Sequence, residues 1–480
     1  MPLTLSESLL IFIGDPAWSS MLVCRETSSG EPSLYITSSL CVFPPLCSFQ
    51  ETLWSRKTQT APDYSPGGRS SLSGSAASSE NSIVPTQTTR RARSPQKGLM
   101  ASLPVLQEET LFRKGFWSYR IPALLYVPQS CTILAFAEER EDEVDEHAKL
   151  IAMRRGTYDG TTHCVQWNKM ETIVNAQLEG HRSMNPCPVY DEVTGNLILF
   201  FIAVPGKVSE NYQIKTKTNL VHLCQVTSTD NGCSWSPAKD LTETVIGTAH
   251  KDWATFAVGP GHGLQLLNEA RSLVIPAYAY RILDPGKKPT PHAFCFVSSD
   301  HGKTWAMGNF VAKESALECQ VAEVHSQGER VLYCNARSSQ GARVQAVSYN
   351  HGMGFDGGQQ IEKLVEPPHG CHGSVTGFPS PANMKSECQD SWVLYSHPTD
   401  PAGRRNLGVY LNKCPLDPAC WTRPTLIFKG LCAYSDLQHM GQGPDGFPLF
   451  CCLFEFGTSS QYKEIVFLMF TLKQAFPSEC

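Results

Sequence analysis

The stretch Ser228-Thr229-Asp230-Asn231-Gly232-Cys233-Ser234-Trp235 recurs as Ser298-Ser299-Asp300-His301-Gly302-Lys303-Thr304-Trp305. A weaker third copy is Ser348-Tyr349-Asn350-His351-Gly352-Met353-Gly354-Phe355. The shared pattern, Ser-x-Asp-x-Gly-x-Thr-Trp, is typical of a hairpin turn in which Asp caps backbone amides, Gly takes a positive φ and Trp packs between neighbouring units. Such a unit, repeated in a β-rich chain, predicts a β-propeller.

Short β-rich runs between turn signals surround these repeats from residue 100 onward. Examples are residues 133–137, 197–202, 273–277 and 465–470. Long amphipathic helices are scarce, and residues 208–218 are expected to supply one short helix. About 380 residues at four strands per blade suit six blades, so we expect an all-β, six-bladed β-propeller over residues 100–480.

Composition changes near Met100. Residues 62–98 are dense in Ser, Pro, Gly, Gln and Thr and end in the basic patch Arg90-Arg91-Ala92-Arg93. Such a segment has too little apolar surface to offset chain entropy, so we expect residues 1–99 to be a low-complexity, largely disordered extension. The basic patch is either a localisation element or a solvated charge run in a linker, and the second interpretation is favoured.

Charge and composition exclude several classes of protein. The net charge is -5 and the pI is near 6.3, so no global field recruits nucleic acid or an anionic membrane. No apolar run approaches the ~20 residues of a transmembrane helix, and the start of the chain does not match a signal peptide. The 19 cysteines lack zinc-site spacing, and Asn-x-Ser/Thr does not occur. We therefore expect a cytosolic protein without a metal or other cofactor.

A further motif is Tyr119-Arg120-Ile121-Pro122. Proline disfavours the helical region for its predecessor, so we expect Ile121 to be extended and Arg120 to stand at a strand end. The order of Arg-Ile-Pro followed by the repeated Ser-x-Asp-x-Gly-x-Thr-Trp turns, which are called Asp-boxes, resembles that of the sialidases (neuraminidases). The stretches 181–188, 317–324 and 432–438 resemble the animal cytosolic members of that family.

The resemblance implies a propeller with its site at the central axis and the activity of a retaining exo-α-sialidase. Its substrates would be terminal α-linked sialic acids on glycoproteins, oligosaccharides and gangliosides. Because sialic acid carries a carboxylate, several guanidinium forks should bind it. The resemblance gives Arg120, Arg337 and Arg404 this role, with Arg405 as a competing position for the third.

The resemblance also implies the reacting groups. Tyr434 would be the nucleophile, because a neutral phenol is not repelled by the carboxylate on the anomeric carbon. Glu318 would be its base and Asp145 the general acid/base, with Asp142 as the alternative. Carboxylates crowd the run 141–147, so we expect them to raise the pKa of Asp145.

The remaining predicted site residues hold the arginines or contact the sugar. Glu455 would steady the first arginine, while Glu138 and Arg140 would form a charged wall, the alternative being a solvated ion-pair face. Residues expected beside the substrate are Ile121, Met184, Asn185, Glu210, Tyr278 and Tyr280. There are two rival functions. One is a protein that binds sialic acid without cleaving it, and the other is a propeller that serves only as a scaffold.

Overall fold

The computed structural model describes residues 10–13, 20–26, 32–37, 101–326, 328–381 and 391–480. The chain divides into two compact units, residues 1–90 and 91–480. The described part of the first unit is a three-stranded antiparallel sheet, which was not predicted from the sequence, made of β1 (Leu10–Ile13), β2 (Ser20–Glu26) and β3 (Pro32–Thr37). The segment 62–98 and its basic patch lie outside the described residues.

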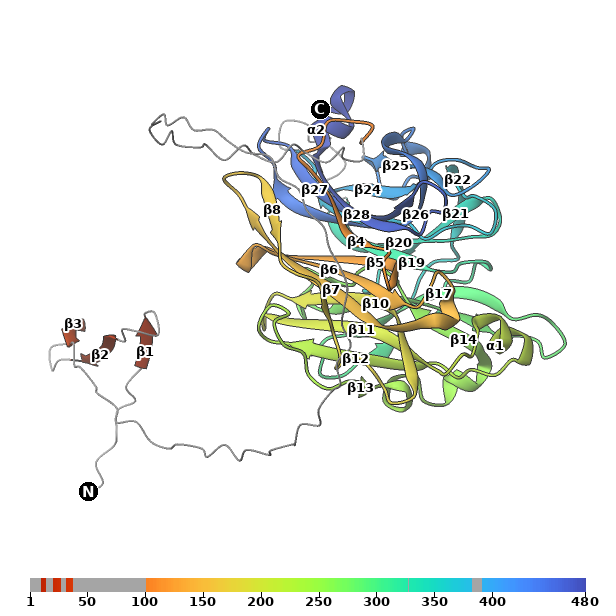
Figure 1. The fold of residues 1–480 in the computed structure, drawn as a ribbon, viewed down its shortest axis with the longest axis horizontal. Coiled ribbons are helices and arrows are strands. Elements are labelled where there is room, and N and C mark those ends of the chain that lie inside the picture. The colour runs from red at the N-terminus through yellow and green to blue at the C-terminus, as the bar shows by residue number, and fades with distance from the viewer. Residues whose placement is uncertain (1–9, 14–19, 27–31, 38–100, 327, 382–390) are drawn as a thin grey trace, which may run out of the picture. The chain divides into compact units, whose positions relative to one another are not determined.

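The second unit consists mainly of antiparallel sheets in which most strands pair with the next along the chain (Figure 1). One sheet contains β5 (Ser118–Val127), β6 (Thr132–Arg140), β7 (Ala148–Asp159), β8 (Cys164–Trp167) and β9 (Glu171–Thr172). The next contains β10 (His181–Asp191), β11 (Asn196–Pro205), β12 (His222–Ser228) and β13 (Lys239–Asp240). A third contains β14 (Trp253–Val258), β15 (Leu264–Gln265), β16 (Leu273–Arg281), β17 (Thr290–Ser298) and β18 (Ala306–Met307).

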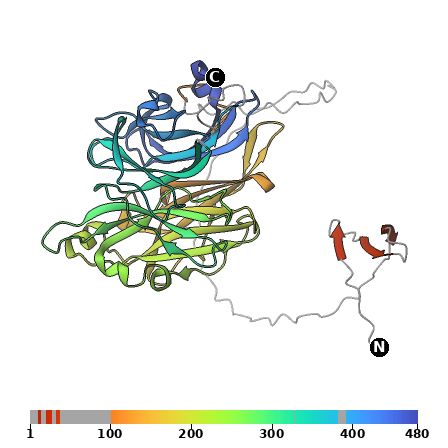
Figure 2. The ribbon, with the colours of Figure 1, turned by 180° about the vertical axis from the view of Figure 1, so that it is seen from behind.

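Two further sheets complete this unit. One contains β19 (Cys319–Ser326), β20 (Glu329–Ala336), β21 (Ala342–Ser348) and β22 (Gln359–Val365). The other has seven strands, namely β23 (Ser374–Pro379), β24 (Ser391–Pro398), β25 (Arg405–Asn412), β26 (Thr425–Gln442), β27 (Pro448–Gly457), β28 (Glu464–Thr471) and β4 (Gln107–Arg113). Meanders of this kind are those of a β-propeller. The sheets around β10–β13 and β23–β28 lie on opposite sides of the unit in both views (Figures 1 and 2).

The seven-stranded sheet is two sets of strands joined by one long strand. The first half of β26 pairs with β25 and the second half pairs with β27. At the far edge β4, from the start of the unit, pairs with β28 near the chain end, in the register Glu464↔Arg113. The two ends of the unit are therefore held in one sheet.

The repeated turns have the predicted hairpin chemistry. The amide of Gly232, at φ +79°, donates to Ser228 Oγ at 2.9 Å, and the amide of Ser234 donates to Asp230 Oδ1 at 2.9 Å. The second copy repeats these bonds at 2.8 and 2.9 Å. Trp305 packs edge-on against Phe200 of β11, with ring centroids 4.7 Å apart. The prediction that the tryptophan packs between neighbouring units is confirmed.

The predicted strands and the short helix are also present. Runs 133–137, 197–202, 273–277 and 465–470 lie in β6, β11, β16 and β28, and their apolar side chains are buried. Helix α1 (Glu210–Thr216) begins after Ser209, whose hydroxyl accepts from the Tyr212 amide at 3.0 Å. The described residues also include a second helix, α2 (Leu472–Ala475), and six short helical turns. These turns are η1 (Pro128–Ser130), η2 (Asp145–His147), η3 (Thr242–Ile246), η4 (Gly247–Asp252), η6 (Pro418–Cys420) and η7 (Pro477–Glu479). Within the described residues, no helix is long and apolar enough to cross a bilayer.

Candidate active site

A cavity of about 420 Å³ gathers most of the predicted site residues. Thirteen of the fifteen line it: Arg120, Ile121, Arg140, Asp145, Met184, Asn185, Glu210, Tyr278, Tyr280, Glu318, Arg337, Arg404 and Tyr434. The other two, Glu138 and Glu455, are fully buried and hydrogen-bonded to residues of the lining. Residues more than 300 positions apart in the chain therefore meet at one place.

The strand carrying Arg120 has a β-bulge at the site. Its register with β6 shifts between Arg120 and Ala123, and Ile121 has φ +60°. The expectation that Ile121 is extended is therefore wrong. A positive φ strains a β-branched residue, and the bond that compensates it is the Ile121 amide donating to Glu455 Oε1 at 3.0 Å. The bulge turns the Arg120 side chain toward the cavity.

Strand β10 also has a β-bulge with a residue at positive φ. Its register shifts between Met184 and Cys187, and Asn185, which also precedes a proline, has φ +55°. The Asn185 amide donates to Glu138 Oε1 at 2.7 Å. In both strands a buried glutamate thus stabilises a strained backbone where the chain faces the cavity.

Glu455 ties three groups together. Its carboxylate accepts from Arg120 Nε at 3.0 Å and Nη2 at 3.5 Å, and from the amides of Ile121 and Tyr434 at 3.0 and 3.1 Å. Glu455 is fully buried, so each of these bonds forms in a medium that strengthens it. The residue therefore fixes Arg120 and Tyr434 relative to one another.

The three predicted arginines converge around Tyr434. Arg337 Nη1 lies 2.8 Å from the Tyr434 hydroxyl. The guanidinium carbons of Arg120 and Arg404 lie 5.6 and 5.4 Å from the centre of the Tyr434 ring. Arg404 lines the cavity whereas Arg405 is exposed, so of the two competing positions it is Arg404 that joins the cluster.

Tyr434 and Glu318 form a hydrogen-bonded pair. The phenol donates to Glu318 Oε1, and Glu318 Oε2 accepts from Arg337 Nη1 at 2.7 Å. Burial and the Glu318 charge raise the pKa of Tyr434 well above its usual value. Burial is the largest effect and acts to raise the pKa of Glu318, but the Arg337 charge and smaller effects of neighbouring groups together outweigh it, so the net shift is downward. The resting pair is therefore a neutral phenol and a carboxylate.

Asp145 differs from the expectation in its pKa. Its carboxylate is 65% exposed and accepts from Arg140 Nη1 at 2.5 Å and Arg120 Nη1 at 3.5 Å. Partial burial acts to raise the pKa of Asp145, but these two cations outweigh it and lower the pKa. The prediction that neighbouring carboxylates raise it is wrong, because Asp145 faces arginines rather than acids.

The alternative acid, Asp142, is engaged elsewhere. It accepts from the Val144 amide at 2.8 Å and pairs with His147 Nδ1 at 2.9 Å, and it does not line the cavity. The loop is also anchored through Glu143, whose carboxylate accepts from Lys463 Nζ at 2.6 Å. Of the carboxylates in this run, Asp145 and Glu146 line the cavity, and Asp145 is the one that accepts from Arg140 and Arg120.

Two further walls complete the cavity. Arg140 Nε donates to Glu138 Oε2 at 2.8 Å, and both side chains are fully buried, so the interpretation as a solvated ion-pair face is wrong. On the other wall the Tyr278 hydroxyl donates to Glu210 Oε1 at 3.3 Å. Burial, and then the Glu318 charge, raise the pKa of Glu210 to about 7.

Tyr278 and Tyr280 share a strand face, as alternation predicts. Their ring centroids lie 6.3 Å apart, and both rings line the cavity.

Tyr462 and Arg182 are among the lining residues that were not predicted from the sequence. The Tyr462 ring stacks under the Arg120 guanidinium at 3.8 Å, and its hydroxyl accepts from Arg404 Nη1 at 3.0 Å. Tyr462 sits in a polar turn with no periodic pattern, so the sequence held no signal for it. Arg182 lies two residues before Met184 and contacts its sulfur at 3.2 Å, so strand alternation could have found it.

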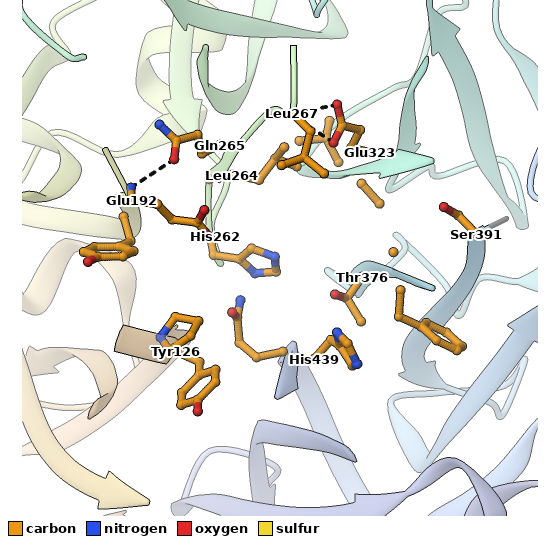
Figure 3. Close-up of a pocket in the computed structure, with 18 of the residues that line it drawn as sticks. Tyr126, Glu192, His262, Leu264, Gln265, Leu267, Glu323, Thr376, Ser391 and His439 are labelled. Atoms are coloured by element: carbon orange, nitrogen blue, oxygen red, sulfur yellow. Dashed lines mark hydrogen bonds between the residues drawn. The ribbon is translucent and has the colours of Figure 1, made fainter. Parts of the chain in front are cut away.

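A second, larger cavity of about 560 Å³ lies at the opposite ends of the same strands (Figure 3). Tyr126 lines it and is six residues beyond Arg120 on β5, a separation of roughly 20 Å at ~3.3 Å per residue. His262 points into it and its Nδ1 lies 2.7 Å from Asp436 Oδ1. None of the predicted site residues lines this cavity. Within the described residues, no group of three or more His, Cys, Asp or Glu could hold a metal ion.

Comparison with known proteins identifies the family of the chain. The family described as BNR repeat-like domain matches residues 132–446. The chain is 62% identical over 379 residues to Sialidase-2 of Mus musculus, covering 79% of this chain and 99% of that protein. It is 44% identical over 393 residues to Sialidase-3 of Homo sapiens, covering 74% and 90%. The chain belongs to the sialidase family. It is thus a glycoside hydrolase, and the exo-α-sialidase activity expected from the sequence is that of its family.

Solved structures show the same fold at low identity. A leech intramolecular trans-sialidase complexed with 2,7-anhydro-Neu5Ac matches this sialidase with a TM-score of 0.60 at 16% identity, covering 78% of this chain and 71% of that one. A Hadza microbial sialidase matches with a TM-score of 0.59 at 24% identity, covering 74% and 66%.

Proposed function

We propose that this sialidase is a retaining exo-α-sialidase that cleaves terminal sialic acids through Tyr434 as its nucleophile. The observation that carries the proposal is the Tyr434 hydroxyl, which donates to Glu318 and lies 2.8 Å from Arg337 in the middle of the arginine cluster. Six blades fit the sheets of residues 101–480 when β26 is counted as shared between two four-stranded sets.

Substrate binding begins with the carboxylate of sialic acid. Arg120, Arg337 and Arg404 offer it converging N–H donors, and charge-assisted bonds of this kind are strong. Because the arginines also surround Tyr434, the bound carboxylate brings the anomeric carbon over the phenol oxygen. Met184 and Asn185 would contact the N-acetyl group, and Glu210, with Tyr278 and Tyr280, the remaining hydroxyls.

The first chemical step forms a bond between the Tyr434 oxygen and the anomeric carbon. The phenol proton passes to Glu318, and Arg337 stabilises the negative charge that develops on the phenol oxygen. The glycosidic bond breaks at the same time, and the leaving oxygen takes a proton from Asp145.

The second step reverses these roles. Asp145, now a carboxylate, takes a proton from water, and the water oxygen attacks the anomeric carbon. The bond to Tyr434 breaks and the phenolate recovers its proton from Glu318. Two inversions at one carbon give a product with the configuration of the substrate.

Asp145 must carry a proton in the first step, although Arg140 and Arg120 lower its pKa in the empty cavity. A bound carboxylate would neutralise part of the Arg120 charge and add a negative charge nearby, and both effects raise the pKa of Asp145. Substrate binding would therefore prepare the acid.

The substrates would be sialylated glycoproteins, oligosaccharides and gangliosides, since the reacting groups touch only the terminal sugar. A reducing compartment, the cytosol, suits the fifteen cysteines of residues 101–480 that the structure describes as free thiols.

The test is release of free sialic acid from an aryl α-sialoside by residues 100–480 and by the full chain. Wild type should turn over, and Tyr434→Phe should lose most activity while still binding free sialic acid. No turnover between pH 4.5 and 7, with sialic acid still bound, would favour the binding protein without chemistry.

A further inference from the structure

His372 lies directly behind Tyr434, outside the cavity. It lies two residues before β23, is fully buried and is not part of the cavity lining. Its ring centroid is 5.2 Å from that of Tyr434, and the two ring planes are inclined by 34°. The imidazole therefore packs against the phenol ring without lining the cavity.

The imidazole is an unusual group for this position. Neither ring nitrogen makes a hydrogen bond of normal geometry, and the Pro260 carbonyl only partly offsets the burial. Burying a polar group without such a bond costs about 1–3 kcal/mol of folding free energy. A phenyl ring of similar size would not carry this cost. A polar side chain retained against stability points to a use in function.

The charges that act on the ring include that of Glu318, the partner of Tyr434. Burial lowers the pKa of His372 to about 4, while Glu318 and Asp436 act to raise it and Arg343 acts to lower it. The ring is therefore neutral at neutral pH, and it lies within the electrostatic range of the carboxylate that takes the Tyr434 proton.

We infer that His372 is a positioning residue for the nucleophile: its neutral ring holds the Tyr434 hydroxyl on Glu318 and presents a polar edge to the charge that moves between them. The inference rests on the proposed function. As the proton passes from Tyr434 to Glu318, negative charge leaves the carboxylate and appears on the phenol oxygen. A neutral imidazole has one donor and one acceptor and can respond to that shift, whereas a phenyl ring has neither.

The experiment compares His372→Phe and His372→Gln with wild type, using a full chain and an aryl α-sialoside. His372→Phe keeps the packing and removes the polar edge. We expect its kcat to fall about tenfold, less than for removal of a group that touches the reacting atoms. Its KM and its affinity for free sialic acid should not change, because the arginines are untouched. His372→Gln keeps a planar polar group and should retain most of the wild-type kcat.

Stability supplies an independent readout. The folded pKa of His372 lies below its unfolded value, so its contribution to stability is lost as pH falls from about 6.5 toward 4. His372→Phe removes both this loss and the unbonded polar group. Its urea midpoint should therefore exceed that of wild type, with a difference that grows between pH 7 and 5.

The outcomes separate the two proposals. Absence of turnover in wild type overturns both the proposed function and the role of His372. Turnover in wild type with an unchanged kcat in His372→Phe overturns the role of His372 alone. If His372→Phe does not fold, the pH profile of kcat in His372→Gln decides. A loss of kcat that is equal at all pH values, together with a loss of affinity for sialic acid, would mean that His372 is merely structural and would overturn its role.

Discussion

Replacing Glu455 by Gln tests how the fold builds the site. The Glu455 carboxylate is 3.0 Å from Arg120 Nε, and the two side chains are 0% and 8% exposed. Removing one charge from a buried pair costs about 3–5 kcal/mol, because the other charge is left without its partner. Arg120 keeps a contact with Asp145 at 3.5 Å, so we expect the lower end, a loss of about 3 kcal/mol in the free energy of unfolding.

The same change should damage activity. The glutamine introduced by Glu455→Gln would present an amide NH₂ to at least one of the Arg120, Ile121 and Tyr434 donors, so the bulge that aims Arg120 would relax. A misplacement of about 1 Å costs roughly a hundredfold in rate, and kcat/KM should fall by about that factor.

The assays are urea unfolding and kcat/KM on an aryl α-sialoside. Glu464→Gln is the matched control: its carboxylate is 3.1 Å from Arg113 Nε, but the pair is exposed by 20% and 63%. Exposed pairs contribute about 0–1 kcal/mol, so this variant should resemble wild type. A Glu455→Gln protein as stable and active as Glu464→Gln would refute the reasoning.

Four further predictions concern Asp145, Glu210 and the extension. Asp145→Asn should lose about a hundredfold or more in kcat on a natural sialoside but far less on an aryl sialoside, whose leaving group needs no acid; equal losses would contradict the role of Asp145. In wild type kcat/KM should rise as pH falls from 7 to 5, because the fraction of Asp145 that carries a proton grows as pH falls toward its lowered pKa. Glu210 has a pKa raised to about 7, so KM should fall as pH rises through 7 and the carboxylate forms; Glu210→Gln should abolish that dependence. Deleting residues 1–99 should leave kcat/KM unchanged, and a large fall would show that the extension takes part in activity.

Much of the fold could be read from local patterns. The Asp-box turns depend on a few bonds within eight residues, such as Ser234 to Asp230, and these form wherever the pattern occurs. The buried strands and helix α1 follow from short-range periodicity in the same way. The pairing of β4 with β28 had no such signal, because it joins residues more than 350 positions apart.

The sequence allowed the residues of the candidate site to be predicted, but not their conformations or their pKa values. Resemblance supplied the arginines, Tyr434 and Glu318, and the structure brings them together. The positive φ of Ile121 was missed because a proline rule describes local sterics, whereas the distant carboxylate of Glu455 stabilises the strained conformation. The lowered pKa of Asp145 was missed for the same reason: the cations that set it come from other strands.

The most direct test of the account is to find which atom the sugar bonds to during turnover. Rapid acid quenching of the enzyme with an aryl α-sialoside, followed by peptide mapping by mass spectrometry, should place the sialyl group on the peptide containing Tyr434. The account predicts this adduct in wild type, its absence in Tyr434→Phe, and a first-formed product with the α configuration by NMR. A sialyl group on Glu318, or a first-formed β product without any adduct, would contradict it.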